Sequence, residues 1–352
     1  METLKINETP KRTSRNFNIN NIKLENIEIP EQVEEFKNIQ IKSKQVTIES
    51  KVDEYTLTYG LGENLENQVK QQSNKPIKLT IDGKLNEEIE LDFNFDEQNA
   101  NLLENIEIIA NKNSKATIII KYTSNENIKA YHNGIIRTIA EENADINIVL
   151  VNLVNSNSNN FISIENTLNK NSNIKYNIVD FGGKNSITNY YSNLLGEQSN
   201  NTLNTIYLGG KDQLFDLNYI AKLRGKKSNI DIEVQGALKE NSKKHFKGTI
   251  DFKKGCKKAT GNENESCMLL SDTAKSLSLP MLLCSEEEVE GNHSSSAGKI
   301  GEKELFYIMS RGFELKEAMK LMVRAKFNKI LARIENEELK NIILKEIDER
   351  LD

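Results

Sequence analysis

Alternating apolar and polar positions recur through the middle of the chain. Small polar pairs precede them, and the second members of these pairs follow one another at intervals of 28 residues. After each pair, apolar side chains fall on every second position, which is typical of a β-strand with one buried face. The copy after Asn201 is weaker, with Thr202 and Asn204 ahead of Ile206 and Leu208. The pairs end at Thr117, Asp145, Asn173, Asn201 and Asn229, and the clearest alternations are Ile118, Ile120, Tyr122; Ile146, Ile148, Leu150; Ile174, Tyr176, Ile178; and Ile230, Ile232, Val234.

A second short strand fits later in each repeat. Turn-forming sequences such as "NSNSNN", "GGKNS" and "GGKDQ" separate it from the first. The expected second strands cover Phe161–Ile164, Ile187–Tyr191, Phe215–Ile220 and Phe246–Ile250.

Strands at a fixed period, without helical stretches between them, exclude a βαβ sheet, whose parallel neighbours need helical crossovers. They favour stacked coils, in which each coil places similar residues over the one below. We therefore predict a mainly β fold, a right-handed parallel β-helix over residues 76–298. An irregular β-sandwich is the alternative. Residues 1–75 form a less regular N-terminal α+β region, with one short helix expected near Glu31–Lys37.

The pattern becomes helical at the C-terminus, over residues 299–352. The first expected helix begins at Glu302, and Gly312 is placed to end it. A second is expected from Leu315 to Arg333, and a third carries Leu339, Ile342, Ile343 and Ile347 at spacings of three and four. Such a module can cap an exposed sheet edge or dock a partner.

Composition narrows the function classes. The net charge of −5 argues against nucleic-acid binding, which needs a basic face. No apolar run approaches the roughly 20 residues of a membrane span, and the N-terminus lacks the apolar core of a secretory signal. We therefore expect a cytoplasmic protein without a membrane partner. Three widely spaced cysteines do not form a disulfide framework.

Common catalytic motifs are absent from the sequence. It contains no GxxxxGK[ST], GxGxxG, HExxH, CxxC or GxSxG, so no nucleotide site is expected on this chain. Many parallel β-helices are carbohydrate-active enzymes with acids along one coil face. This chain instead gathers its acids at Glu286–Glu288 and Glu290. A carbohydrate-active enzyme remains one alternative.

The segment "VEGNHSSSAGKIGEKELFYIMSRG" resembles the signature of the SufB/SufD family of iron–sulfur cluster assembly scaffolds. "CMLLSDTAKSLSLP" and "HFKGTIDF" also resemble family segments, and "LKINETPKRTSRNFNIN" is similar to the opening of the SufD branch, with Ser14 where an aromatic residue is usual. The residues that match the signature are Val289, His293, Gly298, Leu305, Phe306, Tyr307, Ser310, Arg311 and Gly312.

The resemblance implies a non-catalytic scaffold built on a β-helix. A nascent iron–sulfur cluster would form at the interface of two core subunits, with sulfur from a cysteine desulfurase system. A SufC-like ATPase would dock on the C-terminal helices, at Leu305, Phe306, Tyr307, Ser310, Arg311 and Gly312. His293 stands where the SufD branch has an interface histidine, and the chain lacks the Glu-His-Glu of SufB, so it is SufD-like.

Three residues are candidates for the cluster interface: His293, Cys267 and Glu290. Imidazole and thiolate are suitable iron ligands, and a carboxylate can hold iron transiently or orient the imidazole. Each has a structural alternative. His293 could be a hydrogen-bonded turn residue and Cys267 a core residue, because the SufB cysteine aligns with Glu265, two positions earlier.

The other cysteines receive structural interpretations. We expect Cys284 to be a small buried apolar residue, and Cys256 to lie exposed on a basic turn. Three functions remain open: a SufD-like subunit beside a SufB-like partner, a homodimeric scaffold that binds the cluster itself, and the carbohydrate-active enzyme.

Overall fold

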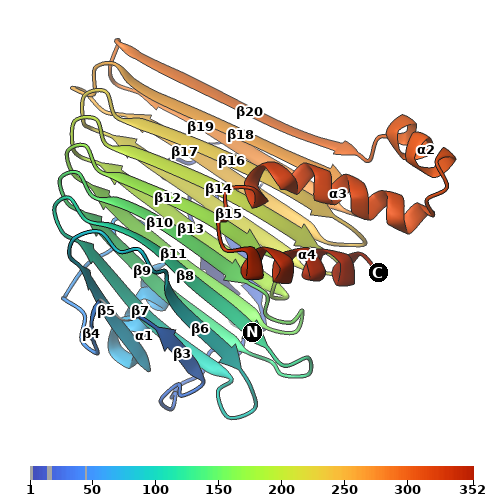
Figure 1. Cartoon of the computed structure of the whole chain (residues 1–352), viewed down its shortest axis with the longest axis horizontal. Helices are drawn as coiled ribbons and strands as arrows, with labels where there is room; N and C mark the ends of the chain where they lie inside the picture. Colours follow the sequence, from blue (N-terminus) through green and yellow to red (C-terminus); the bar gives the residue numbers. More distant parts are fainter. Residues whose placement is uncertain (1–2, 14–17, 44–45) are drawn as a thin grey trace.

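The computed structural model shows a long parallel β-helix with helices packed against one side (Figure 1). It describes residues 3–13, 18–43 and 46–352, so Ser14 lies outside the described residues. Two nine-stranded sheets face each other, and the chain alternates between them coil by coil. The predicted parallel β-helix is confirmed.

The first sheet, sheet I, has the order β20-β18-β16-β14-β12-β10-β8-β6-β3. All pairs from β6 to β20 are parallel. Its strands are β3 (Ile39–Lys42), β6 (Ile89–Phe95), β8 (Lys115–Ser124), β10 (Asp145–Asn152), β12 (Asn173–Asp180), β14 (Asn200–Gly209), β16 (Asn229–Leu238), β18 (Ala259–Leu269) and β20 (Val289–Lys299).

The second sheet, sheet II, has the order β19-β17-β15-β13-β11-β9-β7-β5-β4. Its strands are β4 (Thr47–Glu49), β5 (Lys75–Ile81), β7 (Asn101–Ala110), β9 (Tyr131–Ala140), β11 (Asn159–Leu168), β13 (Asn185–Leu194), β15 (Leu214–Leu223), β17 (Lys243–Phe252) and β19 (Lys275–Cys284). The inward side chains of both sheets form one continuous apolar core.

The predicted register is right in part. Asp145 pairs with Asn173 as expected, but it also pairs with Lys115 and not Thr117. Asn173 pairs with Asn200 and not Asn201. Coil lengths therefore vary, because turns of different length join the same strands.

The one-residue shift explains the weak repeat after Asn201. Leu203 and Tyr207 are inward apolar residues of β14, whereas Ile206 and Leu208 point outward and pack under the C-terminal helices. A slip of one residue exchanges the two faces of a strand. Ile206 and Leu208 therefore belong to a second core, which lies between sheet I and the C-terminal helices.

Asparagine has a structural role in the turns. Asn113, Asn143 and Asn171 all have positive φ, in the left-handed region that asparagine tolerates better than most residues. Their side chains also bond between coils, from Asn143 Nδ2 to Asn113 Oδ1 (2.9 Å) and from Asn171 Nδ2 to Asn143 Oδ1 (3.2 Å). Stacked coils repeat this arrangement because each turn lies over the one before.

The two ends of the β-helix differ. At the N-terminal end, β3 and β4 pair antiparallel with β6 and β5 and cover both sheet edges. The helix expected near Glu31–Lys37 is wrong: this segment contains two bends and no helix, and Phe36 is buried against Phe93 and Phe95. At the C-terminal end, β19 and β20 are edge strands with no further strand beside them in the described ranges.

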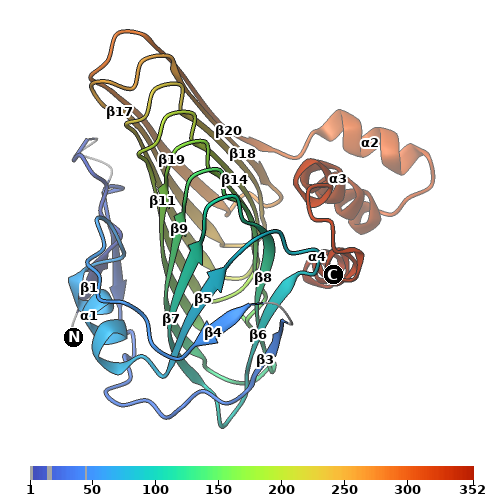
Figure 2. The same ribbon diagram turned by 60° about the vertical axis from the view of Figure 1, so that its left-hand side comes forward.

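The terminal segments cover opposite outer faces (Figure 2). The hairpin of β1 (Thr3–Ile6) and β2 (Ile22–Glu25) packs with helix α1 (Glu63–Gln72) on sheet II. Helices α3 (Leu315–Leu331) and α4 (Glu337–Leu351) pack on sheet I, while α2 (Glu302–Ser310) has no buried residue. The three predicted C-terminal helices are confirmed. No helix in the described part of the chain has the length and apolar character to span a bilayer.

Candidate functional site

Two inward columns of sheet I gain acidic residues in the last complete coil of the β-helix. Residues paired between neighbouring strands stack in columns, and one inward column of sheet I ends with Glu263 on β18 and His293 on β20. The neighbouring column likewise changes from Val234 to Glu265. Below Glu263 the column is apolar over six successive strands, with Ile89, Ile118, Ile148, Tyr176, Leu203 and Ile232.

Glu265 is fully buried and bound on several sides. Its Oε1 lies 2.7 Å from the Nζ of Lys244, which is also fully buried. The hydroxyls of Ser295 and Ser278 donate to its Oε2 at 2.7 and 3.0 Å. The carboxylate charge is thus balanced by a lysine reaching across from sheet II.

Glu263 has no such partner. It is 2% exposed, and neither carboxyl oxygen accepts a hydrogen bond. Burial, and then the negative charge of Glu265, raise the pKa of Glu263 to about 8. The side chain lies over Gly248 of β17, where a Cβ would come within 2.0 Å of Oε2. A neutral carboxylic acid therefore lies next to the last strand of the solenoid.

Cys267 follows on the same inward face of β18. Its side chain is 3% exposed, and burial raises the pKa of its thiol, an effect that the charge of Lys244 partly offsets. It pairs with Ala297, four positions beyond His293 along β20. At about 3.3 Å per residue, the backbone positions of His293 and Ala297 are roughly 13 Å apart along β20.

His293 and Glu290 both lie exposed on the edge strand β20. They are three residues apart, so their side chains point to opposite faces of the strand. The described ranges contain no group of three or more His, Cys, Asp or Glu residues placed to hold a metal ion. The three predicted interface residues are not brought together within this chain, and their roles stay predictions.

Two expectations for the other cysteines are wrong. Cys284 is exposed, because it ends β19 at the uncovered end of the β-helix. Cys256 is fully buried, because its turn directs the side chain into the main core. Burial also raises the pKa of the Cys256 thiol.

The predicted docking residues lie on α2 and the turn after it, and all but the half-buried Leu305 are exposed. Phe306 is 74% and Tyr307 58% exposed. Arg311 donates from Nη2 to the Tyr307 hydroxyl at 3.0 Å, and Gly312 ends the helix with φ 98°. Nearby exposed apolar side chains are Met309, Phe313, Leu315 and Leu321. We call this set, with Leu305 and Ser310, the α2 patch.

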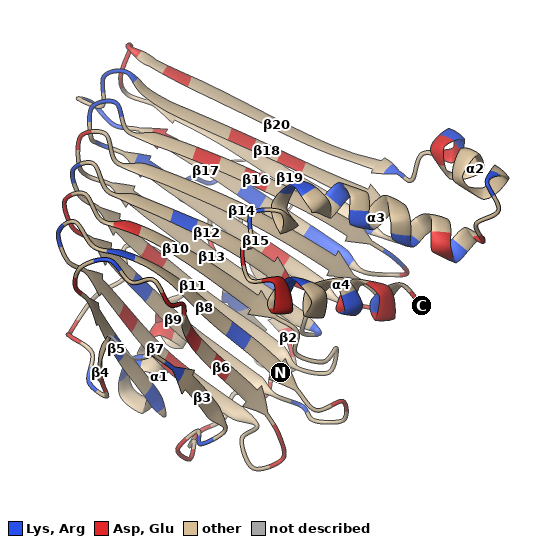
Figure 3. Cartoon of the chain, in the orientation of Figure 1, with Lys and Arg blue, Asp and Glu red and all other residues tan. Residues whose placement is uncertain are grey.

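Helix α3 connects the α2 patch to the back of the interior site. Figure 3 shows basic residues along α3 and acidic bands on β18. Lys326 Nζ donates to Ser266 Oγ at 2.6 Å, and Ser266 lies between Glu265 and Cys267 on the outer face of β18. Lys329 Nζ lies 2.6 Å from Glu233 Oε2 on β16.

The comparison with known families decides what kind of protein this is. Residues 93–326 match the family described as "SUF system FeS cluster assembly, SufBD core domain". The chain belongs to the SufBD core family. The matched range includes both sheets from β6 on, the interior site and most of α3, and the resemblance inferred from the sequence is confirmed.

Curated SufBD relatives match part of the chain. The iron–sulfur cluster assembly protein SufD of Bacillus subtilis is 25% identical over 226 residues, or 63% of this chain and 51% of that protein. A SufBD family protein of Pyrococcus horikoshii is 33% identical over 166 residues, or 46% of this chain and 36% of that protein. The matched region thus spans about half or less of these relatives.

Sequence reasoning overlooked Glu263 and Lys244 as members of the interior site. The signal was present in "GNENESC", where Glu263, Glu265 and Cys267 alternate at strand spacing. Earlier repeats have apolar residues at the inward position that corresponds to Glu263. The partner, Lys244, lies on the opposite sheet, and only the stacking of coils shows that the two meet.

Proposed function

We propose that this chain is a SufD-like scaffold subunit of a SufBCD-type complex that builds and releases a nascent iron–sulfur cluster. The observation that carries the proposal is the uncovered end of the solenoid. There Glu263 and Glu265 replace the apolar residues Ile232 and Val234 of the coil before, and the edge strand β20 presents His293 to solvent.

The uncovered end fits a protein interface. Edge strands leave backbone donors and acceptors unpaired, and these can pair with another chain. A SufB-like partner at β19 and β20 would meet His293 directly and would cover Glu263 and Glu265. The cluster is the cargo of such an interface, with Cys267 and Glu290 as further candidate ligands.

The α2 patch fits a second partner. Exposed aromatic residues with a neighbouring arginine are enriched at the energetic centres of protein interfaces. We propose that a SufC-like ATPase docks here, that residues 299–352 form the docking module, and that residues 1–75 and 76–298 are the N-terminal region and the core. Sulfur would come from a cysteine desulfurase system.

In this proposal the chain is not itself an enzyme, and it works in the cytoplasm without nucleic acid or a membrane. The ATPase activity belongs to the partner. Membership of the SufBD family favours this function, or the homodimeric scaffold, over the carbohydrate-active enzyme.

The test is anaerobic co-expression with the SufB-like and SufC-like proteins of the same organism. We expect the three chains to co-purify, and His293→Ala to lower the visible absorption of the assembled cluster without loss of the complex. Ser296→Ala, on the same exposed strand, is the matched control. Normal cluster assembly by His293→Ala would remove this residue from the mechanism. A cluster on the isolated chain would instead support the homodimeric scaffold.

A further inference from the structure

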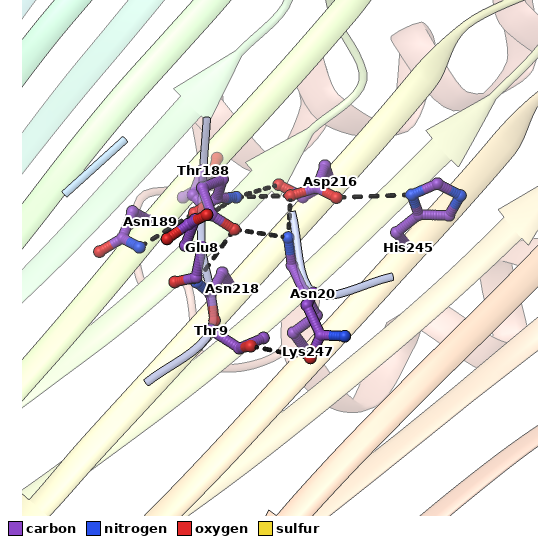
Figure 4. Close-up of polar contacts among 10 residues, drawn as sticks. Glu8, Thr9, Asn20, Thr188, Asn189, Asp216, Asn218, His245 and Lys247 are labelled. Carbon is purple, nitrogen blue, oxygen red and sulfur yellow. Dashed lines mark hydrogen bonds and ion pairs between the residues drawn. The ribbon is translucent and has the colours of Figure 1, made fainter. Parts of the chain in front are cut away.

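The outer face of sheet II carries a polar row that is hidden from solvent. Asn189, Asn218 and Lys247 are register partners on β13, β15 and β17, and Asp216 precedes Asn218 on the same face of β15. All four are fully buried, although they point away from the β-helix core. An N-terminal segment covers them (Figure 4). We call residues 7–13 of this segment the strap.

Asn7 is the residue that joins the strap to the polar row. Its Nδ2 donates to Asp216 Oδ1 at 2.6 Å, and its Oδ1 accepts from Asn189 Nδ2 at 2.9 Å. Its carbonyl oxygen accepts from Lys247 Nζ at 2.9 Å. A φ of 58° lets the backbone turn into this position. One asparagine therefore bonds to three neighbouring strands.

The same lysine forms a buried ion pair. Lys247 Nζ lies 2.6 Å from Asp216 Oδ1, with both side chains removed from solvent. Three residues earlier on β17, Lys244 points to the opposite face and binds Glu265 inside the solenoid. Strand β17 is thus fixed by one lysine on each face.

The strap covers polar groups, so its contacts can break while the hairpin before it stays in place. Ile6, just before it, packs in the apolar cluster with Ile22, Leu24 and Phe161 and anchors the hairpin. The strap itself covers charged and amide groups, which water can solvate once the strap lifts. At its far end, Thr13 Oγ1 lies 3.7 Å from Met281 Sδ on β19, the edge strand of the uncovered end.

We propose that the strap is a positioning element of the interior site: by holding Lys247 on the outer face of β17, Asn7 keeps Lys244 against Glu265 on the inner face. The two lysines share one short stretch of backbone, so a displacement of β17 that frees one also shifts the other. This role is independent of what the chain assembles.

The test uses the full-length chain with lysine side chains labelled with ¹⁵N at Nζ. Buried ammonium groups in ion pairs exchange their protons slowly and give resolved NMR signals. In the wild type we expect such signals from both Lys244 and Lys247. Asn7→Gly keeps the left-handed backbone but removes the side-chain bonds to Asp216 and Asn189 that hold the strap in place. The carbonyl of residue 7 should then leave Lys247, and we expect both signals to be lost. Asn26→Gly, at an exposed position with the same φ of 58°, is the matched control and should keep both.

Hydrogen exchange of the backbone separates positioning from general loss of stability. We expect about tenfold faster exchange on β17 and β18 in Asn7→Gly, and unchanged exchange on β9 and β11. Loss of the Lys247 signal alone would show that the strap is only a cover. Retention of both signals, or faster exchange on every strand, would also overturn the proposal. If Asn7→Gly does not fold, Asn189→Ala removes one bond to the strap and serves in its place.

Discussion

Lys244 and Glu265 form an ion pair inside the solenoid, with 2.7 Å between Nζ and Oε1 and no exposure of either side chain. They come from opposite sheets, so the pair joins β17 to β18 across the core. Removing one residue of such a pair strongly lowers the free energy of unfolding, because the remaining charge stays buried without a partner.

Replacing the lysine alone should therefore destabilise the protein. We expect Lys244→Met to lower the free energy of unfolding by about 3–5 kcal/mol. The double variant Lys244→Met with Glu265→Gln should recover most of that loss, because no buried charge remains. Urea unfolding of the wild type and the variants measures both effects. Equal stability of wild type and Lys244→Met would contradict the buried pair.

Glu263 should make stability depend on pH. Its folded pKa of about 8 lies above the ordinary value of 4.5, so the folded state holds a proton that the unfolded state releases. The stabilisation is complete below about pH 4.5 and is lost as the pH rises toward 8, by up to about 1.4 kcal/mol per pH unit. Glu263→Gln should flatten this part of the profile and be more stable than wild type at pH 8. Denaturant unfolding at several pH values checks the slope, and Glu287→Gln, an exposed change, is the control.

The three cysteines should differ in reactivity. Cys284 is exposed, whereas Cys256 and Cys267 are buried and burial raises the pKa of both thiols. Since the thiolate is the reactive form, a thiol-alkylating reagent at pH 7.5 should label Cys284 first. Mass spectrometry of the labelled peptides gives the three rates. Rapid labelling of Cys267 in the folded chain would mean that the interior site is open to solvent.

The α2 patch should matter for association and not for folding. Phe306 is mostly exposed, so Phe306→Ser should change the free energy of unfolding by less than about 0.5 kcal/mol. We expect the same variant to reduce co-purification of the SufC-like ATPase strongly. Phe327→Ser is the contrasting variant, because Phe327 of α3 is fully buried against sheet I and its replacement should destabilise the chain by roughly 3–5 kcal/mol. A Phe306→Ser chain that still binds the ATPase normally would place the docking surface elsewhere.

The bond from Lys326 of α3 should stabilise strand β18, whose inner face carries the interior site. This bond, to Ser266, holds the helix against β18, between the inward residues Glu265 and Cys267. We expect Lys326→Met to speed amide exchange on β18 while leaving β10 unchanged. Lys320→Met, which removes a lysine of the same helix that bonds to Asp352 instead, is the control. Hydrogen exchange measured by mass spectrometry resolves the two strands. Unchanged exchange on β18 would contradict the role of Lys326.

Much of this fold follows from local patterns. The alternation at Ile118, Ile120 and Tyr122 predicted strands with one buried face, and its recurrence predicted stacked coils. The C-terminal helices follow from apolar residues three and four apart, such as Leu339 and Ile343, and both are buried. These features are local, because a strand or helix face depends only on the spacing of nearby side chains.

The rest depended on contacts between distant residues. A one-residue shift at Asn200 reversed the faces of β14, and only the pairing with β12 and β16 shows it. The irregular segment around Phe36 was mistaken for a helix because that side chain is held by rings of β6, far along the chain.

By itself, the sequence determined the stacked coils, the helical tail and membership of the SufBD family. It also singled out His293 as a candidate interface residue. The tertiary structure decided which residues surround that histidine. Glu263 is buried beside it, and Lys244 of β17 reaches Glu265 from the other sheet. On the outer face of β17, Asn7 accepts a hydrogen bond from Lys247. The physical reason is that strand spacing sets only the face on which a side chain lies. The neighbour that it meets depends on turn lengths and on the stacking of coils about thirty residues apart.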